Sequence, residues 1–312
     1  YILPLDFEFN TKKVALMQIN FETDFNDRFI FIIYPPYLNY YWKTYLVKKI
    51  LGNFRIIKLL HGSDSLDIPY MFNDLIIKTK YIKRFIHSMI DTRYICEYFN
   101  LKNNYPKRKC KIYNLLLDQN IVTPEKIRDL DKNSEKMGPI YDIFIDINSI
   151  STELLKYTLY DVIFLKYLYQ SFPNDIVYTK LIPELTRINF LEKKGITNYL
   201  SSTHKVINKM NNFFIKDKDN LKLIDTYYMF TNYLNIKDYP INLLENINYF
   251  KSSIEIMKKY VIYKNMIKTY KIFINTKTEY KQEFPNTIKF NSKSELLNKL
   301  IILFENEIKI SI

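Results

Sequence analysis

Short apolar segments alternate with segments of helical period over the first third of the chain. The apolar segments are rich in Ile, Phe and Val and are separated by polar turns, which predicts strands. The expected strands are residues 1–8, 14–20, 28–34, 55–60 and 90–92. Residues 39–51 have helical spacing and end at Gly52, a typical helix stop. Strands that alternate with helices in this way predict an α/β layer fold.

The pattern changes in the second third of the chain. Residues 106–111 are a basic run, and residues 118–149 are polar with weak periodicity, so we expect loops with short helices there. Residues 151–170 have the clearest helical pattern in the chain, with Ser151 or Thr152 as the N-cap.

The rest of the chain is helical in pattern and rich in Lys, Tyr and Asn. We therefore expect two domains, an α/β domain over residues 1–175 and a basic, mainly helical domain of unassigned role over residues 176–312. In stretches such as 249–273, Lys and Tyr interleave at helical spacing. This pattern fits a basic wall that guides a nucleic-acid strand. It also fits an amphipathic bundle that keeps its Lys side chains in water.

The chain is strongly basic, with 46 Lys and Arg against 33 Asp and Glu, a net charge of +13 and a pI near 9.3. Such a balance is compatible with a polyanionic partner, and nucleic acid is the commonest one. Lysines spread over solvated faces would give the same balance. The abundance of Lys, Ile, Asn and Tyr follows from AT-rich codons, so we expect an AT-rich source genome, with a large DNA virus among the candidates.

Cysteine and histidine are scarce. Two cysteines, Cys96 and Cys110, cannot build a disulfide framework, which favours an intracellular, reducing compartment such as the cytoplasm or nucleus. The three histidines give no Cys/His zinc spacing. The longest apolar stretches, such as residues 29–34, are too short to span a bilayer, so we expect no membrane partner. The chain has no signal-peptide pattern and begins almost inside a strand, so we expect residues 1–312 to be part of a longer protein.

Four acidic residues stand out against their apolar surroundings. Asp6 and Glu8 are one residue apart on the first expected strand, so both side chains project from one face. Asp67 begins the helix that follows strand 55–60, and Asp161 lies within an apolar helix. Each has a structural explanation: a solvated strand end for the pair, an N-cap for Asp67 and a polar stripe for Asp161. As a set they are candidate ligands of one metal site, because a buried carboxylate is costly unless it is paired or bound to a metal.

Three short motifs occur in order along residues 1–170. The first is LDFEFNTKKVALMQIN, an Asp-x-Glu strand followed by a strand that carries Gln18. The second is KLLHGSDSLDIPYMFND, a Lys-x-x-His-Gly strand end followed by Asp67. The third is YTLYD, in which Tyr157 lies four residues before Asp161. Together they resemble the three motifs of the DEDD superfamily of 3′–5′ exonucleases, in its ribonuclease D branch.

The details of the motifs place the resemblance in the tyrosine (DEDDy) subgroup, because Lys156 stands where the other subgroup has His. Phe7 departs from the pattern, since the family usually has Thr between its first two acids. The segment from His61 to Asp67 is one residue longer than usual, which makes Asp64 an alternative second-motif acid. We prefer Asp67, because DIPYMFND continues as the family's helix does.

The resemblance implies a ribonuclease H-like mixed sheet flanked by helices, and hydrolysis of RNA or DNA from the 3′ end. Such chemistry uses two divalent cations, Mg²⁺ or Mn²⁺, roughly 3.5–4 Å apart. By family analogy, Asp6 bridges both ions and Asp67 holds the second. Glu8 and Asp161 complete the site that activates water, and Tyr157 hydrogen-bonds the attacking water together with Glu8.

A second class of function is open to the same sequence. An exonuclease-like domain can serve as a catalytically silent scaffold that binds nucleic acid or another partner, and the basic charge suits that role. The intact set of four acids and Tyr157 argues against it, since a scaffold has no physical need for a buried anionic cluster. The partner that we expect is single-stranded or 3′-ended nucleic acid, RNA or DNA, and the sequence gives no protein partner.

Overall fold

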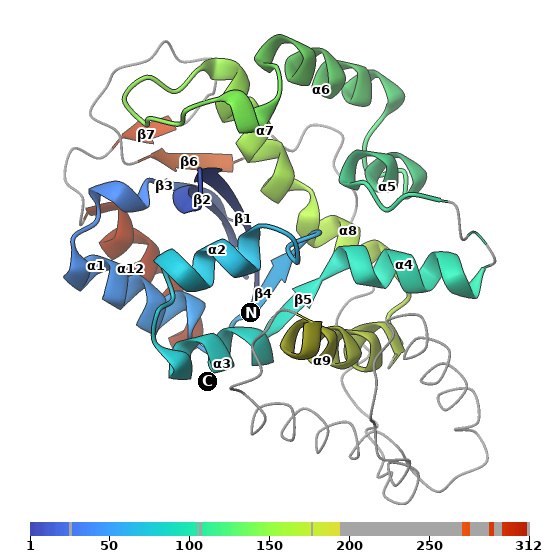
Figure 1. Cartoon of the computed structure of the whole chain (residues 1–312), viewed down its shortest axis with the longest axis horizontal. Helices are drawn as coiled ribbons and strands as arrows, with labels where there is room; N and C mark the ends of the chain where they lie inside the picture. The colour runs from blue at the N-terminus through green and yellow to red at the C-terminus, as the bar shows by residue number, and fades with distance from the viewer. Residues whose placement is uncertain are drawn as a thin grey trace, which may run out of the picture.

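A seven-stranded mixed sheet lies at the centre of the protein, with helices against both of its faces (Figure 1). The structure is a computed structural model. It describes residues 1–24, 27–103, 105, 108–175, 177–193, 270–274, 287–289 and 295–310. The strand order is β5-β4-β1-β2-β3-β6-β7. The α/β class predicted from the sequence is therefore confirmed.

The first three strands form an antiparallel meander, and the other four add to its edges in parallel. β4 pairs with β1 and β5 with β4 on one side, while β6 pairs with β3 and β7 with β6 on the other. The strands are β1 (Ile2–Asn10), β2 (Lys13–Glu22), β3 (Arg28–Ile33), β4 (Ile57–Leu60), β5 (Met89–Asp91), β6 (Tyr270–Ile274) and β7 (Thr287–Lys289).

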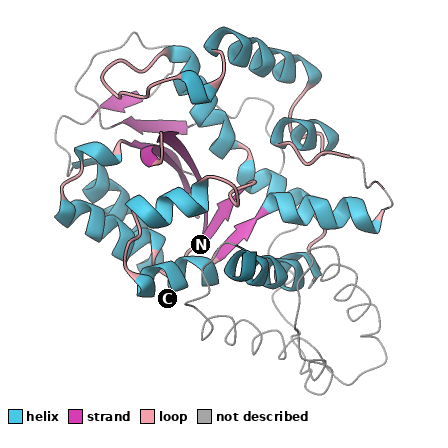
Figure 2. Cartoon of the chain, in the orientation of Figure 1, coloured by secondary structure: helices cyan, strands magenta, loops and turns pink. Residues whose placement is uncertain are grey.

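Helices connect and cover these strands, as Figure 2 shows in cyan. The α-helices are α1 (Tyr40–Leu46), α2 (Asp67–Asp74), α3 (Thr79–His87), α4 (Thr92–Lys102), α5 (Ile112–Asp118), α6 (Pro124–Met137), α7 (Thr152–Ile163), α8 (Leu165–Ser171), α9 (Ile182–Lys193) and α12 (Glu295–Ile310). Short 3₁₀ or π turns are η1 (Pro35–Tyr37), η2 (Val47–Leu51), η3 (Ile140–Asp142) and η4 (Val177–Leu181). None of the helices described is long and apolar enough to cross a membrane.

The five strands expected from the sequence all form, within a few residues of the expected bounds. The expected helix over 151–170 is two helices, because α7 ends at Ile163 and α8 begins at Leu165. Ser151 is the N-cap of α7, and its side chain accepts a hydrogen bond from the backbone N–H of Leu154. The polar segment 118–149, where short helices were expected, contains the 14-residue helix α6.

The helical expectation beyond residue 175 is wrong where β6 and β7 form. These residues extend the sheet from the β3 edge, and Tyr, Ile and Phe in β6 are residues that favour strands. The other described parts of this region, η4, α9 and α12, are helical. The proposed boundary at 175/176 stays a prediction, as does the role of 249–273, most of which lies outside the described residues.

Alternation along β1 assigns its side chains to two faces. Asp6 and Glu8 share one face with Gln18 and Asn20 of β2, since Asp6 pairs directly with Gln18. α7 packs against this face, where the amide of Asn20 donates to the carbonyl of Val162 at 3.1 Å. The opposite face carries the aromatic contacts: Phe9 meets Tyr70 of α2, and Phe21 meets Phe304 of α12. β1 is therefore enclosed on both faces and paired along both edges.

Cys96 and Cys110 form a disulfide, which corrects the expectation of reduced cysteines. Cys96 lies on α4, and the segment before α5 returns to it, which places the two Cα atoms 6.0 Å apart. That separation is within the range that a disulfide spans. The sequence separation of 14 residues gave no indication of this pairing. The reducing compartment inferred from the cysteine count stays a prediction.

Asn10 joins the end of β1 to the segment that leads into α7. Its amide donates to the carbonyl of Ile145 at 2.7 Å, and the backbone N–H of Ile145 donates back to its side-chain oxygen at 2.8 Å. We expect Asn10→Ala to lower the free energy of unfolding by about 2 kcal/mol, because it leaves two backbone groups unpaired. Urea denaturation measures this, with the exposed residue Asn114 changed to Ala as the control. Equal stabilities of the two variants would show that the Asn10 contacts contribute nothing.

Candidate metal centre

Three carboxylates converge between β1 and α7. One ligand oxygen from each of Asp6, Glu8 and Asp161 lies within 4.8 Å of the other two. The Glu8 side chain is buried, and the other two are partly exposed. The register of β1 against β2 shifts directly after Glu8, an irregularity that is common beside active sites and that re-aims side chains. The structure thus brings together three of the four acids predicted from the sequence.

The three carboxyl groups of this acidic centre (Asp6, Glu8 and Asp161) all have raised pKa values, because they are like charges in a poorly hydrated place. Burial raises the pKa of Asp6 from 3.8 to about 7. Burial, together with the charges of Asp6, Asp161 and Asp67, raises the pKa of Glu8 well above its usual range. The pKa of Asp161 is also raised, mainly by burial and then by Asp6. A divalent cation would offset this repulsion, so the donor set fits one.

Two tyrosines hydrogen-bond Asp161. Tyr157, one helical turn earlier on α7, donates to its carboxylate, which lowers the pKa of Asp161 against the larger effect of burial. Tyr113 of α5 donates to Asp161 Oδ1 at 3.4 Å. The negative charge of Asp161 and burial raise the pKa of both phenols, so both stay protonated donors. Tyr157 was predicted from the sequence, whereas Tyr113 was not, because no local pattern links it to the acids.

Asp67, the fourth predicted acid, faces the same centre from the first residue of α2. It is outside the group of three whose oxygens approach within 4.8 Å. Burial and the charges of Asp6, Asp91, Asp161 and Asp64 raise its pKa well above the usual range. Its side chain does not cap α2, whose N-cap position is Leu66.

Asp64, the alternative acid, has partners of its own. Tyr94 donates to it at 3.2 Å, and Arg93 forms an ion pair with it at 3.4 Å. An arginine partner offsets the charge of a carboxylate, which makes it a poorer cation ligand. These contacts favour Asp67 over Asp64 as the acid that faces the centre.

Asp91 orders the loop between β4 and α2. It is buried and accepts hydrogen bonds from the backbone N–H groups of Gly62, Ser63 and Arg93 and from the Ser63 hydroxyl, all at 2.8–2.9 Å. Gly62 has a φ of +71°, a conformation that favours glycine. These contacts explain in physical terms why Gly62 and Ser63 stand in this loop.

Lys58, the lysine of the second motif, does not reach the acidic centre. It is fully buried, and its ammonium donates to the carbonyls of Asn53 and Ile56 at 2.9 Å each and to the Ser88 hydroxyl. Burial, and then the charge of Arg187, lowers its pKa well below the usual range. Its contacts hold β4 against neighbouring segments, which is a structural role.

Gln18 is a buried polar residue beside the centre. Its side chain is fully buried, and within the described part of the chain neither Nε2 nor Oε1 has a hydrogen-bond partner. It stands opposite Asp6 on the face that carries the acids. A buried amide without partners is rare in proteins and is expected near a ligand or ordered water. The position of Gln18 beside Asp6 is therefore consistent with a polar ligand bound at the acidic centre.

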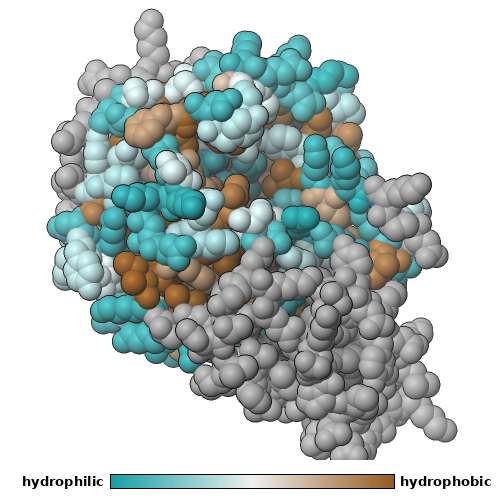
Figure 3. Space-filling view, in the orientation of Figure 1, coloured by the Kyte–Doolittle hydropathy of each residue, from teal (hydrophilic) through white to brown (hydrophobic). Residues whose placement is uncertain are grey.

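On the face shown in Figure 3, brown hydrophobic patches lie among teal hydrophilic residues, one of them along the lower part of the coloured area. The exposed aromatic residues include Tyr40, Tyr41 and Tyr141. Scattered apolar residues of this kind are normal on a protein surface.

The chain is similar to an uncharacterized protein of Acanthamoeba polyphaga mimivirus. The two are 29% identical over 337 aligned positions, which cover 96% of this chain and 65% of the relative. The chain thus spans about two thirds of the length of that relative. No family model matches the chain, and no solved structure matches it. The similarity to a viral protein agrees with the source expected from the composition.

The raised pKa values predict how stability depends on pH in the absence of metal. A carboxyl whose pKa is higher in the folded state, such as Asp6 at about 7, holds its proton more tightly there, so its contribution to stability is lost as pH rises through that value. His61 titrates in the opposite sense, because burial lowers its pKa. Because the two kinds of group oppose each other in the wild type, we compare the free energies of unfolding of the wild type and a variant that lacks one carboxylate.

We expect Asp161→Asn to become more stable than the wild type as pH rises from about 5 to about 8, by on the order of 2 kcal/mol. The physical reason is that one like charge is removed from the centre. Urea denaturation in EDTA measures the difference, with the exposed Asp129 changed to Asn as the control. A difference that does not grow with pH would show that the three carboxylates do not repel one another.

Proposed function

We propose that this protein is a metal-dependent 3′–5′ exonuclease of the DEDDy type, with a ribonuclease H-like α/β domain. The observation that carries the proposal is the approach of Asp6, Glu8 and Asp161 within 4.8 Å. These are the residues of the first and third motifs, 155 positions apart at their widest, on a strand and a helix. A mixed sheet flanked by helices also agrees with the fold that such a domain requires.

The acids would act as ligands of two Mg²⁺ or Mn²⁺ ions. Asp6 has the central place, since its charge acts on Glu8, Asp67 and Asp161 alike. We assign the second cation to Asp6 and Asp67 and the first to the group of three. When bound, such ions lower the pKa of water and neutralise charge that develops on the phosphate.

The protein's own groups orient the reactants. Tyr157 is a protonated donor beside Asp161, and in the proposed reaction it holds the attacking water by a hydrogen bond. Glu8, which is buried in the same group of three, would hydrogen-bond that water together with Tyr157. The hydrolysis breaks the bond between phosphorus and the 3′ oxygen of the preceding nucleotide, and it releases a nucleoside 5′-monophosphate from the 3′ end.

A nuclease assay tests the proposal directly. Matched RNA and DNA strands, labelled at the 5′ or the 3′ end, should be shortened from the 3′ end in Mg²⁺ or Mn²⁺ and left intact in EDTA. Asp6→Asn and Asp161→Asn should each lower the rate by at least about 1,000-fold, because each removes a ligand. Cleavage that persists in Asp6→Asn would refute the assignment. Binding without cleavage in Mg²⁺, Mn²⁺ and Ca²⁺ would instead favour the silent scaffold.

The two tyrosines at Asp161 allow a matched comparison. We expect Tyr157→Phe to lower kcat by about 100-fold, the loss typical of a group that orients or transfers a proton in the reaction. Tyr113→Phe removes the other hydroxyl from the same carboxylate, and we expect a loss of only a few-fold. Mn²⁺ affinity, measured by calorimetry, should stay close to the wild-type value in both. Equal losses in the two variants would show that the tyrosines act only through Asp161.

A further inference from the structure

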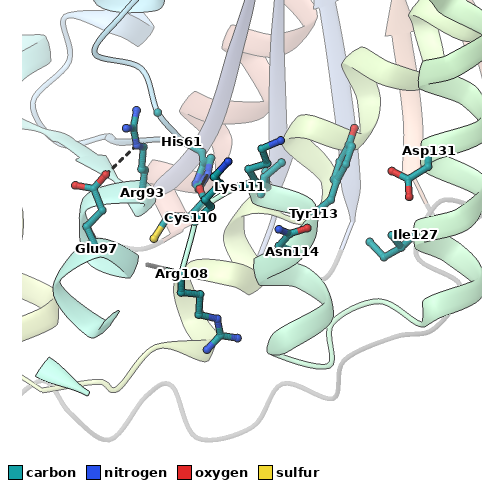
Figure 4. Close-up of a pocket in the computed structure, with 13 residues that line it drawn as sticks. His61, Arg93, Glu97, Arg108, Cys110, Lys111, Tyr113, Asn114, Ile127 and Asp131 are labelled. Carbon is teal, nitrogen blue, oxygen red and sulfur yellow. Dashed lines mark hydrogen bonds and ion pairs between the residues drawn. The ribbon is translucent and has the colours of Figure 1, made fainter. Parts of the chain in front are cut away.

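A cavity of about 720 Å³ lies beside the acidic centre. Its lining comes from the loop after β4, from α4, from residues 108–114 and from α6 (Figure 4). A volume of this size is in the range of small-molecule and cofactor sites. None of the acids predicted from the sequence lines it, so it needs its own explanation.

The cavity borders the acidic centre at Tyr113. This residue lines the cavity, and its hydroxyl donates to Asp161 Oδ1. The charges of Asp6 and Glu8 also act on the Tyr113 phenol. A ligand in the cavity would therefore lie next to the place where the scissile phosphate is expected.

Four cationic side chains line the cavity: Arg93, Arg108, Lys109 and Lys111. Two have carboxylate partners, since Arg93 pairs with Glu97 and Asp64, and Arg108 pairs with Asp118. Among the residues that the structure describes, Lys109 and Lys111 have no ion-pair partner.

The lining also contains the carboxylates of Glu97 and Asp131. Glu97 is engaged by Arg93 at 3.0 Å. In Figure 4, Lys111 and Tyr113 extend to the same side of the segment that carries them, and Arg108 extends to the other side. Since Arg93 and Arg108 are paired, the two lysines are the cations of the lining without an ion-pair partner among the described residues, and they are open to an anionic ligand.

The segment that carries the lysines is held in place at Cys110. Its side chain is bonded to Cys96 of α4, and its carbonyl lies 2.9 Å from Nε2 of His61. The amide of Asn100 donates to the carbonyl of Arg108 at 3.0 Å. Groups whose backbone is fixed in advance lose less entropy when they bind a ligand. The backbone on either side of Cys110, from which the two lysines extend, is therefore fixed before any ligand arrives.

We propose that this cavity binds a backbone phosphate of the nucleic-acid strand, next to the scissile phosphodiester, through Lys109 and Lys111. The inference rests on the proposed exonuclease function and adds a subsite to it. Phosphate contacts fix the register of a strand without reading its sequence, and lysine binds phosphate as a point charge. The subsite would hold RNA and DNA alike, since both carry the same phosphate.

The test compares Lys109→Ala/Lys111→Ala with the wild type, in the full chain with Mn²⁺, on two substrates. One is a 5′-labelled oligonucleotide, as RNA and as DNA. The other is the p-nitrophenyl ester of thymidine 5′-monophosphate, which has one phosphodiester and no neighbouring phosphate. We expect the KM for the oligonucleotide to rise about 10-fold at constant kcat, and the slope of log KM against log salt to fall by about 0.7–1.4. Hydrolysis of the small ester should not change.

The matched control is Lys48→Ala/Lys180→Ala, which removes the same charge from two exposed lysines outside the cavity. An equal rise in KM in this control would overturn the proposal, because general charge would then explain the effect. An unchanged oligonucleotide KM in the cavity variant would overturn it too. Equal losses of activity on the oligonucleotide and on the small ester would also overturn it, since the lysines would then affect the chemical step or the fold.

A binding measurement separates this inference from the proposed function. Fluorescence anisotropy in Ca²⁺ gives the affinity for the oligonucleotide without cleavage. If the wild type cleaves neither substrate, the exonuclease proposal fails. The subsite then stands if the cavity variant binds about 10-fold more weakly than the control variant, and it falls if the two bind equally.

Discussion

The repulsion among carboxylates gathered between β1 and α7 is the constraint on which the site depends. Charges at this distance in a poorly hydrated place repel strongly, and the pKa of Glu8 records that cost, since burial and then the charges of Asp6, Asp161 and Asp67 raise it well above its usual range. The fold holds them together by contacts on all sides: Asn20 bonds α7 to β2, and Asn10 bonds the chain before α7 to β1. The elements that carry the acids are thus joined by asparagine side chains that donate to backbone carbonyls.

The side chains that contact the acidic centre are neutral, whereas the cationic side chains nearby contact other carboxylates or line the cavity. Neutral donors, Tyr113 and Tyr157, contact Asp161 directly. The arginine of this neighbourhood, Arg93, is turned to Asp64 and Glu97 instead. A cation at the centre would compete with a metal ion, whereas a phenol keeps the carboxylate available for one. Lys109 and Lys111, which have no ion-pair partner in the part of the chain that the structure describes, line the neighbouring cavity, where a strand rather than a metal would need them.

The sequence predicted the α/β class and the acids that converge, because both depend on local patterns. Asp6 and Glu8 share a face by strand alternation, and the apolar helix around Asp161 marked that residue as unusual. The proximity of Tyr113 and the Cys96–Cys110 disulfide could not be predicted, since both depend on how the chain returns after α4. β6 was not predicted either, because its pairing with β3 joins strands more than 200 residues apart.

β1 lies inside the sheet, with β4 on one edge and β2 on the other. Local opening in proteins begins at termini, loops and sheet edges, where few contacts hold the backbone. Two of the three acids of the centre are therefore on a strand whose backbone amides should exchange with solvent last. Local unfolding of a helix end or an edge strand does not separate Asp6 from Glu8, because both lie on β1. Their repulsion therefore lowers the free energy of unfolding of the whole sheet. A cation that binds there would stabilise the entire sheet and not merely the residues that hold it.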